Sequence, residues 1–184
     1  DVHAPEPKPL ASGIYGVELL EDQGIVLLLN ELDRYNAWSQ LTGFSGEANS
    51  MHRAAVLCSE LGLQPVIDHW VYNCLNPLRE RLFPGLKPFV SHHAYFVQYG
   101  QQWDGDLGFH VDDSDMTLNV CLEEPLRGAE IYFEGKRCAL HVDGPSQEWE
   151  RYEWAHRRGV GLLHHGKNRH GVRPIIRGIR RNLI

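Results

Sequence analysis

His110 and Asp112 are of the residue types, and at the spacing, that can bind a metal ion. Successive side chains of a strand point to opposite faces, so residues two apart share a face. If this segment is a strand, an imidazole and a carboxylate project together. With one histidine from a distant strand they would form the facial triad of non-haem iron(II), which leaves coordination positions free for small molecules. A His-x-Asp pair by itself is a weak signal, because such a pair is more often a hydrogen-bonded surface couple.

The third ligand has to come from another part of a chain that holds eleven histidines. The candidates in the C-terminal part are His141, His156, His164, His165 and His170. His170 is favoured by the segment that follows it. If residues 176–178 form a three-residue hairpin loop with Gly178 in the left-handed conformation, residue 180 pairs with 174 and residue 184 with 170. His170, Arg180 and Asn182 then share one face.

The distance between His170 and Arg180 supports this pairing. Four strand residues at about 3.3 Å each separate Arg180 from the metal position. A five-carbon diacid bound to the metal at one end spans about half of that distance, and an extended Arg side chain spans about the rest. A guanidinium is also well shaped to bind a carboxylate with two hydrogen bonds. A two-residue turn would instead place Arg180 on the opposite face. Arg173, Arg177 and Arg181 are interpreted as solvated strand residues.

The elements that must position these side chains differ between the two halves of the chain. Residues 1–10 are rich in proline and are expected to form an extended lead-in. A helix over 22–35, capped by Asp22, precedes a polar loop over 40–50. A second helical stretch over 65–82 contains Pro77, which should kink or split it.

From Phe89 onward the pattern is that of short strands separated by turn signals. The expected strands are HHAYFVQY, LGFHV, MTLNVCL, AEIYF, ALHV, GVGLLHH, HGVRPII and IRRNLI. Strands of this kind after two helices predict a mainly β fold with supporting helices, in the form of an antiparallel jelly-roll (cupin-like) barrel. The mouth of such a barrel suits a small-ligand site.

The bulk composition is that of an ordinary globular protein, with 184 residues, 42% hydrophobic and 23% charged. The net charge of −6 disfavours nucleic acid as the main partner. No window approaches the roughly 20 apolar residues that span a bilayer, so we expect no membrane span. The four widely spaced cysteines indicate reduced thiols rather than a disulfide framework. A cytoplasmic location is the default expectation, with removal of a targeting segment left open.

The run that begins at His110, HVDDSDMTLNVCL, resembles the HxDxSxxTxNxxL run in the catalytic domain of procollagen-lysine hydroxylases. The His-x9-Arg spacing from His170 to Arg180 agrees with that domain as well. The chain also resembles the 2-oxoglutarate and iron-dependent oxygenase domain-containing proteins over most of residues 50–184. The matching segments are SMHRAAVLCSELGL, SHHAYFVQY, the HxD run, GAEIYFEG and HRRGVGLLHHGKNRHGVRPIIRGIRRNLI.

This resemblance implies a double-stranded β-helix, with Fe2+ held by His110, Asp112 and His170 and with 2-oxoglutarate and O2 as co-substrates. It implies that Arg180 binds 2-oxoglutarate, which is decarboxylated to succinate and CO2 while a C–H bond is hydroxylated. Related halogenases have a small residue in place of Asp112, so its presence favours hydroxylation. A requirement for ascorbate is left open. Residues 1–184 are expected to form a single catalytic domain, with the lead-in and helices in 1–88 and the barrel in 89–184.

Three further residues are candidates for the co-substrate pocket. Related prolyl hydroxylases place a tyrosine on the strand after HxD, where this chain has Cys121. Tyr99 is the better candidate for that role, although a tyrosine in the barrel core explains it nearly as well. Asn119 shares parity with Cys121 and is expected to line the pocket, because a buried amide needs partners. Asn182 is equally consistent with the pocket and with a structural role.

The favoured interpretation is a hydroxylase of a protein or peptide side chain, with lysine or proline as the leading substrates. The HxDxSxxTxN run favours lysine, and the carboxylates of Asp113 and Asp115 would suit a cationic substrate. A free amino acid or a small metabolite remains an alternative substrate. Two competing interpretations are a Zn2+ or Mn2+ hydrolase and a catalytically idle barrel that acts as a binding module. A hydrolase gives Arg180 no role, and the intact set of His110, Asp112, His170 and Arg180 argues against an idle barrel.

Overall fold

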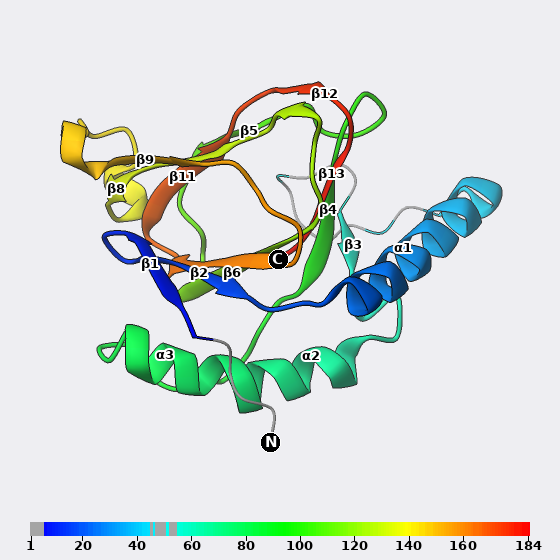
Figure 1. Cartoon of the computed structure of the whole chain (residues 1–184), viewed down its shortest axis with the longest axis horizontal. Coiled ribbons are helices and arrows are strands. Elements are labelled where there is room, and N and C mark those ends of the chain that lie inside the picture. Colours follow the sequence, from blue (N-terminus) through cyan, green and yellow to red (C-terminus); the bar gives the residue numbers. More distant parts are fainter. Residues whose placement is uncertain (1–5, 45, 47–50, 52–54) are drawn as a thin grey trace.

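The computed structural model describes residues 6–44, 46, 51 and 55–184. Two antiparallel sheets enclose the interior of a barrel, and helices cover one side of it (Figure 1). The larger sheet has the strand order β1 (Lys8–Ala11), β2 (Ile14–Glu18), β10 (Val160–His165), β6 (Met116–Glu123), β13 (Arg180–Leu183), β4 (Tyr95–Tyr99) and β3 (Val56–Leu57). The smaller sheet has the order β5 (Leu107–His110), β11 (Asn168–Val172), β8 (Ile131–Lys136) and β9 (Arg151–Trp154). A short ribbon pairs β12 (Ile175–Arg177) with β7 (Arg127–Gly128).

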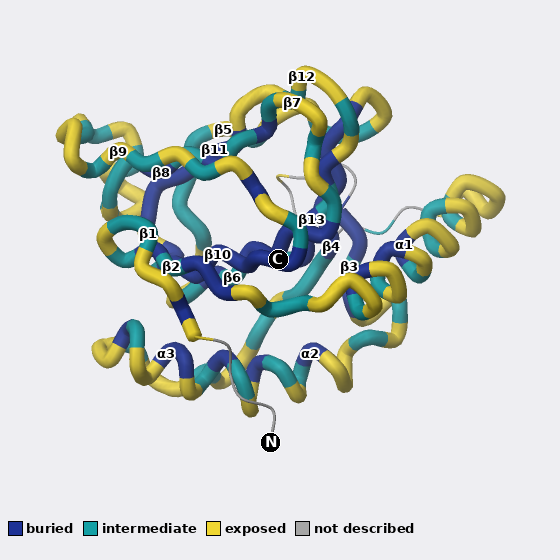
Figure 2. The backbone as a smooth tube through the Cα atoms, viewed as in Figure 1, coloured by how far each residue is buried: buried dark blue, intermediate teal, exposed yellow. Residues whose placement is uncertain are grey.

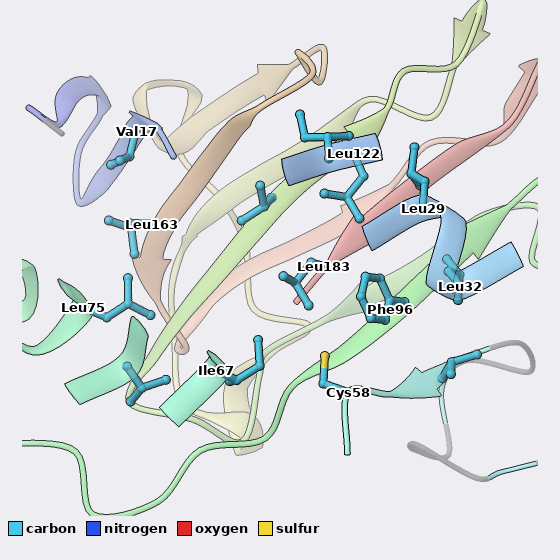
Figure 3. Close-up of a cluster of buried hydrophobic side chains, with 14 of the residues drawn as sticks. Val17, Leu29, Leu32, Cys58, Ile67, Leu75, Phe96, Leu122, Leu163 and Leu183 are labelled. Atoms are coloured by element: carbon cyan, nitrogen blue, oxygen red, sulfur yellow. The ribbon is translucent and has the colours of Figure 1, made fainter. Parts of the chain in front are cut away.

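The helices pack against the outer face of the larger sheet. They are α1 (Asp22–Thr42), α2 (Gln64–Trp70) and α3 (Asn76–Leu82), and a π-helical turn (Val71–Leu75) joins the last two. Figure 3 shows the apolar core between sheet and helices, where Phe96, Leu122 and Leu183 from the strands meet Leu32 and Ile67 from the helices. Burial of this apolar area is the main force that holds the helices on the sheet.

The central strands of the larger sheet are buried on both faces, which Figure 2 shows as dark blue along β10 and β6. Their side chains alternate between two environments. On β6, Val120 and Leu122 belong to the core beneath the helices. Thr117 and Asn119, which are also buried, have the opposite parity and hydrogen bond to residues of the barrel interior. The sheet therefore separates an apolar core from a polar interior.

The helices confirm the expected positions and correct their ends. The helix expected over 22–35 continues to Thr42, so the first residues of the expected loop over 40–50 are helical; residues 45 and 47–50 lie outside the described residues. Asp22 lies inside the helix instead of at its cap position. Pro77 does split the second helical stretch: it has no N–H to donate, and the π-helical turn lies just before it.

Six of the eight expected runs each contain one strand, whereas HGVRPII, expected as one strand, is divided between β11 and β12 in different sheets. The strand expected over 139–142 is wrong, since Ala139–His141 is a 3-10 helix. Its loop is held closed by the Arg137 guanidinium, which bonds Glu150 Oε1 at 2.7 Å and the Pro145 carbonyl at 2.9 Å. β1 begins within the extended lead-in expected over 1–10 and β2 follows that segment, and neither was among the expected strands; residues 1–5 of the lead-in lie outside the described residues. The predicted mainly β class with supporting helices is confirmed.

None of the helices in the described part of the chain combines the length and the apolar character that crossing a membrane requires.

Leu122 provides a direct test of the core between sheet and helices. Its side chain is 0% exposed, whereas that of Leu126, after the same strand, is 73% exposed. We expect Leu122→Ala to lower the free energy of unfolding by about 2–5 kcal/mol, because it removes buried methyl groups and leaves a cavity. Leu126→Ala should change it by less than about 0.5 kcal/mol. Urea denaturation followed by circular dichroism measures both, and equal effects would contradict the packing described above.

Candidate metal centre and co-substrate site

His110 and His170 lie side by side on neighbouring strands of the smaller sheet. They are paired residues of the antiparallel strands β5 and β11, and their ring centroids are 4.3 Å apart. Asp112 lies just beyond β5, where its backbone N–H donates to the Gly166 carbonyl at 2.9 Å. Asp112 Oδ1 is 3.4 Å from His110 Nε2 and 3.6 Å from His170 Nε2. The three ligand atoms are therefore placed to bind one metal ion, although the strand ends before Asp112.

Both imidazoles are held in the same way by the backbone. His110 Nδ1 lies 2.7 Å from the Gly108 carbonyl, and His170 Nδ1 lies 2.9 Å from the Asn168 carbonyl. A carbonyl oxygen only accepts, so each Nδ1 carries the proton and each Nε2 presents its lone pair to the metal position. Burial lowers the pKa of His170 to about 3, which keeps this ring neutral. Burial disfavours the charged form of His110, but its hydrogen bonds with Asp112 and the Gly108 carbonyl outweigh this and raise the pKa of His110 above its usual value. Two imidazoles and a carboxylate are the ligand set of non-haem iron(II).

Asp112 is oriented by the hydroxyl groups of Thr117, on β6 of the larger sheet, and of Ser114, in the loop before it. The Thr117 hydroxyl donates to Asp112 Oδ2 at 2.5 Å, which leaves Oδ1 to face the two histidines, and Ser114 Oγ lies 2.9 Å from Thr117 Oγ1. Burial of Asp112 opposes ionisation, but the hydrogen bond with His110, the charges of nearby histidines and the Thr117 bond outweigh it. The pKa of Asp112 is therefore well below its usual range. In the described residues, His110, Asp112 and His170 form the one cluster with metal-binding spacing.

Gly166 allows the Asp112 loop to lie close to the turn after β10. A Cβ on Gly166 would lie 1.9 Å from the Ser114 carbonyl oxygen, which only a backbone shift could relieve. The Gly166 backbone bonds this loop at both ends, to Asp112 and to Asp115. A close approach that only glycine permits therefore fixes the position of the carboxylate ligand.

Arg180 reaches the interior by a different route from the one that its spacing suggests. Gly178 has a positive φ of +94°, as expected, but residues 176–178 do not join two paired strands. After β11 the chain forms β12 and then crosses to the larger sheet. There Arg180 pairs with Tyr99 on β4, so the expected pairing of residue 180 with 174 is wrong. The parity of β13 still turns Arg180 and Asn182 inward, and both are 0% exposed.

The Arg180 side chain is held by neutral groups. Its Nε donates to Asn182 Oδ1 at 3.0 Å and its Nη1 to the Ala129 carbonyl at 2.7 Å. The guanidinium lies over the ring of Tyr99, 4.6 Å from the centroid. Burial raises the pKa of Tyr99 to about 12, so its phenol is neutral. Asn182 Nδ2 in turn donates to Asn119 Oδ1. All four of the residues proposed from the sequence for the co-substrate pocket are thus buried in one contact network.

The structure also separates the remaining candidate histidines. His164 lies beside the metal site, with its ring centroid 4.8 Å from that of His170, and its Nε2 has no hydrogen-bond partner. His156 contacts Asn182 instead, and His141 lies at the surface beside Cys138. Sequence patterns could not place His156 near Arg180, because it lies in the loop before β10 and has no spacing relation to β13.

Comparison with curated proteins places the chain in a family. It is 38% identical over 177 residues to the 2-oxoglutarate and iron-dependent oxygenase domain-containing protein ICU11 of Arabidopsis thaliana, a match that covers 94% of this chain and 44% of that protein. It is 35% identical to the 2-oxoglutarate and iron-dependent oxygenase domain-containing protein 2 of Mus musculus, over 93% of this chain and 48% of that protein. The chain belongs to the 2-oxoglutarate- and iron-dependent oxygenase superfamily. The oxygenase spans about half the length of the curated relatives that it matches.

A more distant relative agrees with this assignment, and the solved structures match the fold. The oxygenase is 26% identical to the procollagen lysine hydroxylase and glycosyltransferase LH3 of Rattus norvegicus, over 91% of this chain and 22% of that protein. Its fold matches AviO1 of Streptomyces viridochromogenes with a TM-score of 0.68 and 15% identity, over 93% of this chain and 87% of that one. A prolyl-4-hydroxylase of Pseudomonas putida matches with a TM-score of 0.58 and 15% identity, over 93% and 89%. No family model matches the chain. The double-stranded β-helix prediction is confirmed.

Thr117 is a test of how the carboxylate ligand is oriented. Thr117→Val keeps the shape of the side chain but removes the donor to Asp112 Oδ2. We expect the affinity for Fe2+ or Mn2+ to fall by about 10- to 100-fold, as is typical when a residue that orients a metal ligand is lost. Thr117→Ser keeps the hydroxyl and should bind metal within a few-fold of the native chain. Anaerobic calorimetric titration measures these affinities, and equal binding by all three chains would show that the Thr117 bond does not orient Asp112.

Proposed function

We propose that this chain catalyses the hydroxylation of a C–H bond on a lysine side chain of a protein or peptide, with oxidative decarboxylation of 2-oxoglutarate to succinate and CO2. The proposal rests on one observation above all. The His110–Asp112–His170 cluster and the buried Arg180 lie in the interior of the same barrel, one suited to iron(II) and the other to a carboxylate. Bound Fe2+ would supply the O2 chemistry, and the protein would supply binding and orientation.

In this proposal His110, Asp112 and His170 hold the iron and Arg180 binds the distal carboxylate of 2-oxoglutarate. Arg180 Nη2 is buried and has no hydrogen-bond partner, as a donor reserved for a ligand would be. Tyr99 and Asn182 hold the guanidinium in place, one by ring stacking and the other by a hydrogen bond, and Asn119 orients Asn182. A hydrolase gives this set of buried polar groups no role.

Lysine is favoured over other substrates by two observations. The relative LH3 is a lysine hydroxylase by name, and the similarity to it covers 91% of this chain. In addition, Asp113 and Asp115 are exposed and directly follow the metal ligand Asp112. Carboxylates at this position would attract a cationic side chain toward the metal. The chain spans only part of its relatives, so the activity and partners of the whole protein are proposed here. The single-domain division and the cytoplasmic location stay predictions.

Replacement of Arg180 tests the co-substrate site. We expect Arg180→Ala to weaken 2-oxoglutarate binding by about 100-fold, since the charge-assisted hydrogen bonds to the distal carboxylate are lost. The affinity for Fe2+ should stay within a few-fold of the native value, because Arg180 contacts none of the three metal ligands. The weak visible charge-transfer band of the iron chelate, followed during anaerobic titration with 2-oxoglutarate, gives the affinity.

Arg177→Ala is the matched control, because Arg177 is exposed and lies shortly before the start of β13. It should bind 2-oxoglutarate as the native chain does. A native chain that binds iron but develops no band with 2-oxoglutarate would contradict the oxygenase proposal itself.

The substrate proposal has a separate test. We expect Asp113→Asn and Asp115→Asn to raise the KM for a lysine-containing peptide by about 2- to 5-fold each, the usual range for an exposed ion pair. The KM for 2-oxoglutarate should not change. Mass spectrometry of the peptide, which gains one oxygen atom on hydroxylation, and succinate release measure the reaction. Hydroxylation of proline but not lysine peptides, or KM values that ignore both charges, would refute the lysine assignment.

A further inference from the structure

His156 lies in the loop between β9 and β10 and is almost completely buried, at 6% exposure. Its Nδ1 is 3.3 Å from Asn182 Nδ2, and its Nε2 is buried without a hydrogen-bond partner. A buried ring nitrogen in this state is uncommon in native proteins, where buried polar atoms are nearly always paired. His156 is thus joined through Asn182 to Arg180, whose Nη2 is unpartnered in the same way.

The hydrogen bonds of Asn182 determine which nitrogen of His156 carries a proton. Arg180 Nε can only donate, so the oxygen of the Asn182 amide must face it. The amide nitrogen then faces away from Arg180 and donates its two hydrogens, one to Asn119 Oδ1 and one to His156 Nδ1. His156 Nδ1 is therefore the acceptor.

In a neutral imidazole the proton then resides on Nε2, which becomes a donor. Burial and the charge of Arg180 lower the pKa of His156 well below its usual value, so the ring is neutral. The network consequently ends in two buried N–H donors without acceptors, at Arg180 Nη2 and at His156 Nε2.

An anion with two acceptor oxygens is the ligand that matches such an arrangement. A lone buried guanidinium without a carboxylate partner is costly, and an unpaired imidazole N–H beside it adds to that cost. A carboxylate would satisfy both donors and the charge together. From the hydrogen bonds of Asn182 we infer that His156 Nε2–H is a second donor to the distal carboxylate of 2-oxoglutarate, alongside Arg180. This inference rests on the proposed function, which supplies the carboxylate.

Two variants of His156 separate the donor from its structural contact. An Asn side chain reaches the position of the His Nδ1 and can keep the bond to Asn182, but it offers nothing at the position of Nε2. A Gln side chain reaches that second position with its amide nitrogen and keeps a donor there. His156→Asn should therefore lose the proposed interaction, and His156→Gln should retain most of it.

Two ligands separate a role at the distal carboxylate from a general effect on the site. One is 2-oxoglutarate; the other is 2-oxopentanoate, in which a methyl group replaces the distal carboxylate. Both are titrated anaerobically into the Fe2+-loaded full chain, with the charge-transfer band as the signal. We expect His156→Asn to weaken 2-oxoglutarate binding by about 10- to 100-fold, the loss of one hydrogen bond to a charged group. Binding of 2-oxopentanoate and of Fe2+ should change by less than about 2-fold.

The tautomer is measured independently by 15N NMR of the histidine rings. The native chain should show His156 protonated at Nε2 without ligand, and this Nε2 signal should shift when 2-oxoglutarate is added to chain loaded with Zn2+. His156→Asn identifies the signal by its disappearance.

The outcomes distinguish this inference from the proposed function. If the native chain binds 2-oxoglutarate in an Arg180-dependent way but His156→Asn binds it equally well, the inference is wrong and the proposed function stands. Equal losses for both ligands, or a loss that His156→Gln fails to restore, would make His156 a structural residue and overturn the inference too. A native chain that does not bind 2-oxoglutarate overturns both. A selective loss with His156→Asn, restored by His156→Gln, supports it.

Discussion

The burial of the Arg180 guanidinium is the constraint on which the interior of this barrel depends. Arg180 is 0% exposed, and among the described residues no carboxylate lies within ion-pair distance of it, although the charge of Glu130 favours its charged form from farther away. Removing such a charge from water costs several kcal/mol unless hydrogen bonds and an opposite charge compensate. Asn182, the Ala129 carbonyl and the ring of Tyr99 provide the neutral part of that compensation. The missing opposite charge is what an anionic co-substrate would bring.

The larger sheet makes this arrangement possible because it is buried on both faces. Alternate residues of β6 and β13 point to the helices or to the interior, so one strand serves two environments. Leu183 packs beneath the helices while its neighbour Asn182 lies in the polar network. The apolar face holds the helices, and the fixed pleat of the strands then determines where the polar groups lie. A slip of one residue would exchange the two faces, so the core and the site stabilise the same register.

The sequence predicted much of the site because short-range geometry is enough for it. His110 and Asp112 are two residues apart, and strand parity brought Thr117, Asn119 and Cys121 to one side without any knowledge of the fold. Prediction from the sequence failed where pairing between strands distant in the chain determines the structure. The segment after His170 looked like a hairpin, but β11 and β13 belong to different sheets. Arg180 still reaches the interior, because β13 lies in the larger sheet with Arg180 and Asn182 on the face that points to the interior. The 3-10 helix at Ala139–His141 was missed because long-range bonds from Arg137 close that loop.

The sequence by itself determined which chemistry this protein can support: two imidazoles and a carboxylate for a metal, and an arginine for an acid. Residue types and local spacing are sufficient for that, because ligand preference is a property of side chains. Only the tertiary structure decided how these side chains come together and which other histidines lie near them. It paired His170 with His110 across two strands and left His164 beside them. It also brought His156 to Asn182, a contact between residues 26 apart in the chain. Strand order and loop paths fix such contacts, and these depend on the packing of the whole core.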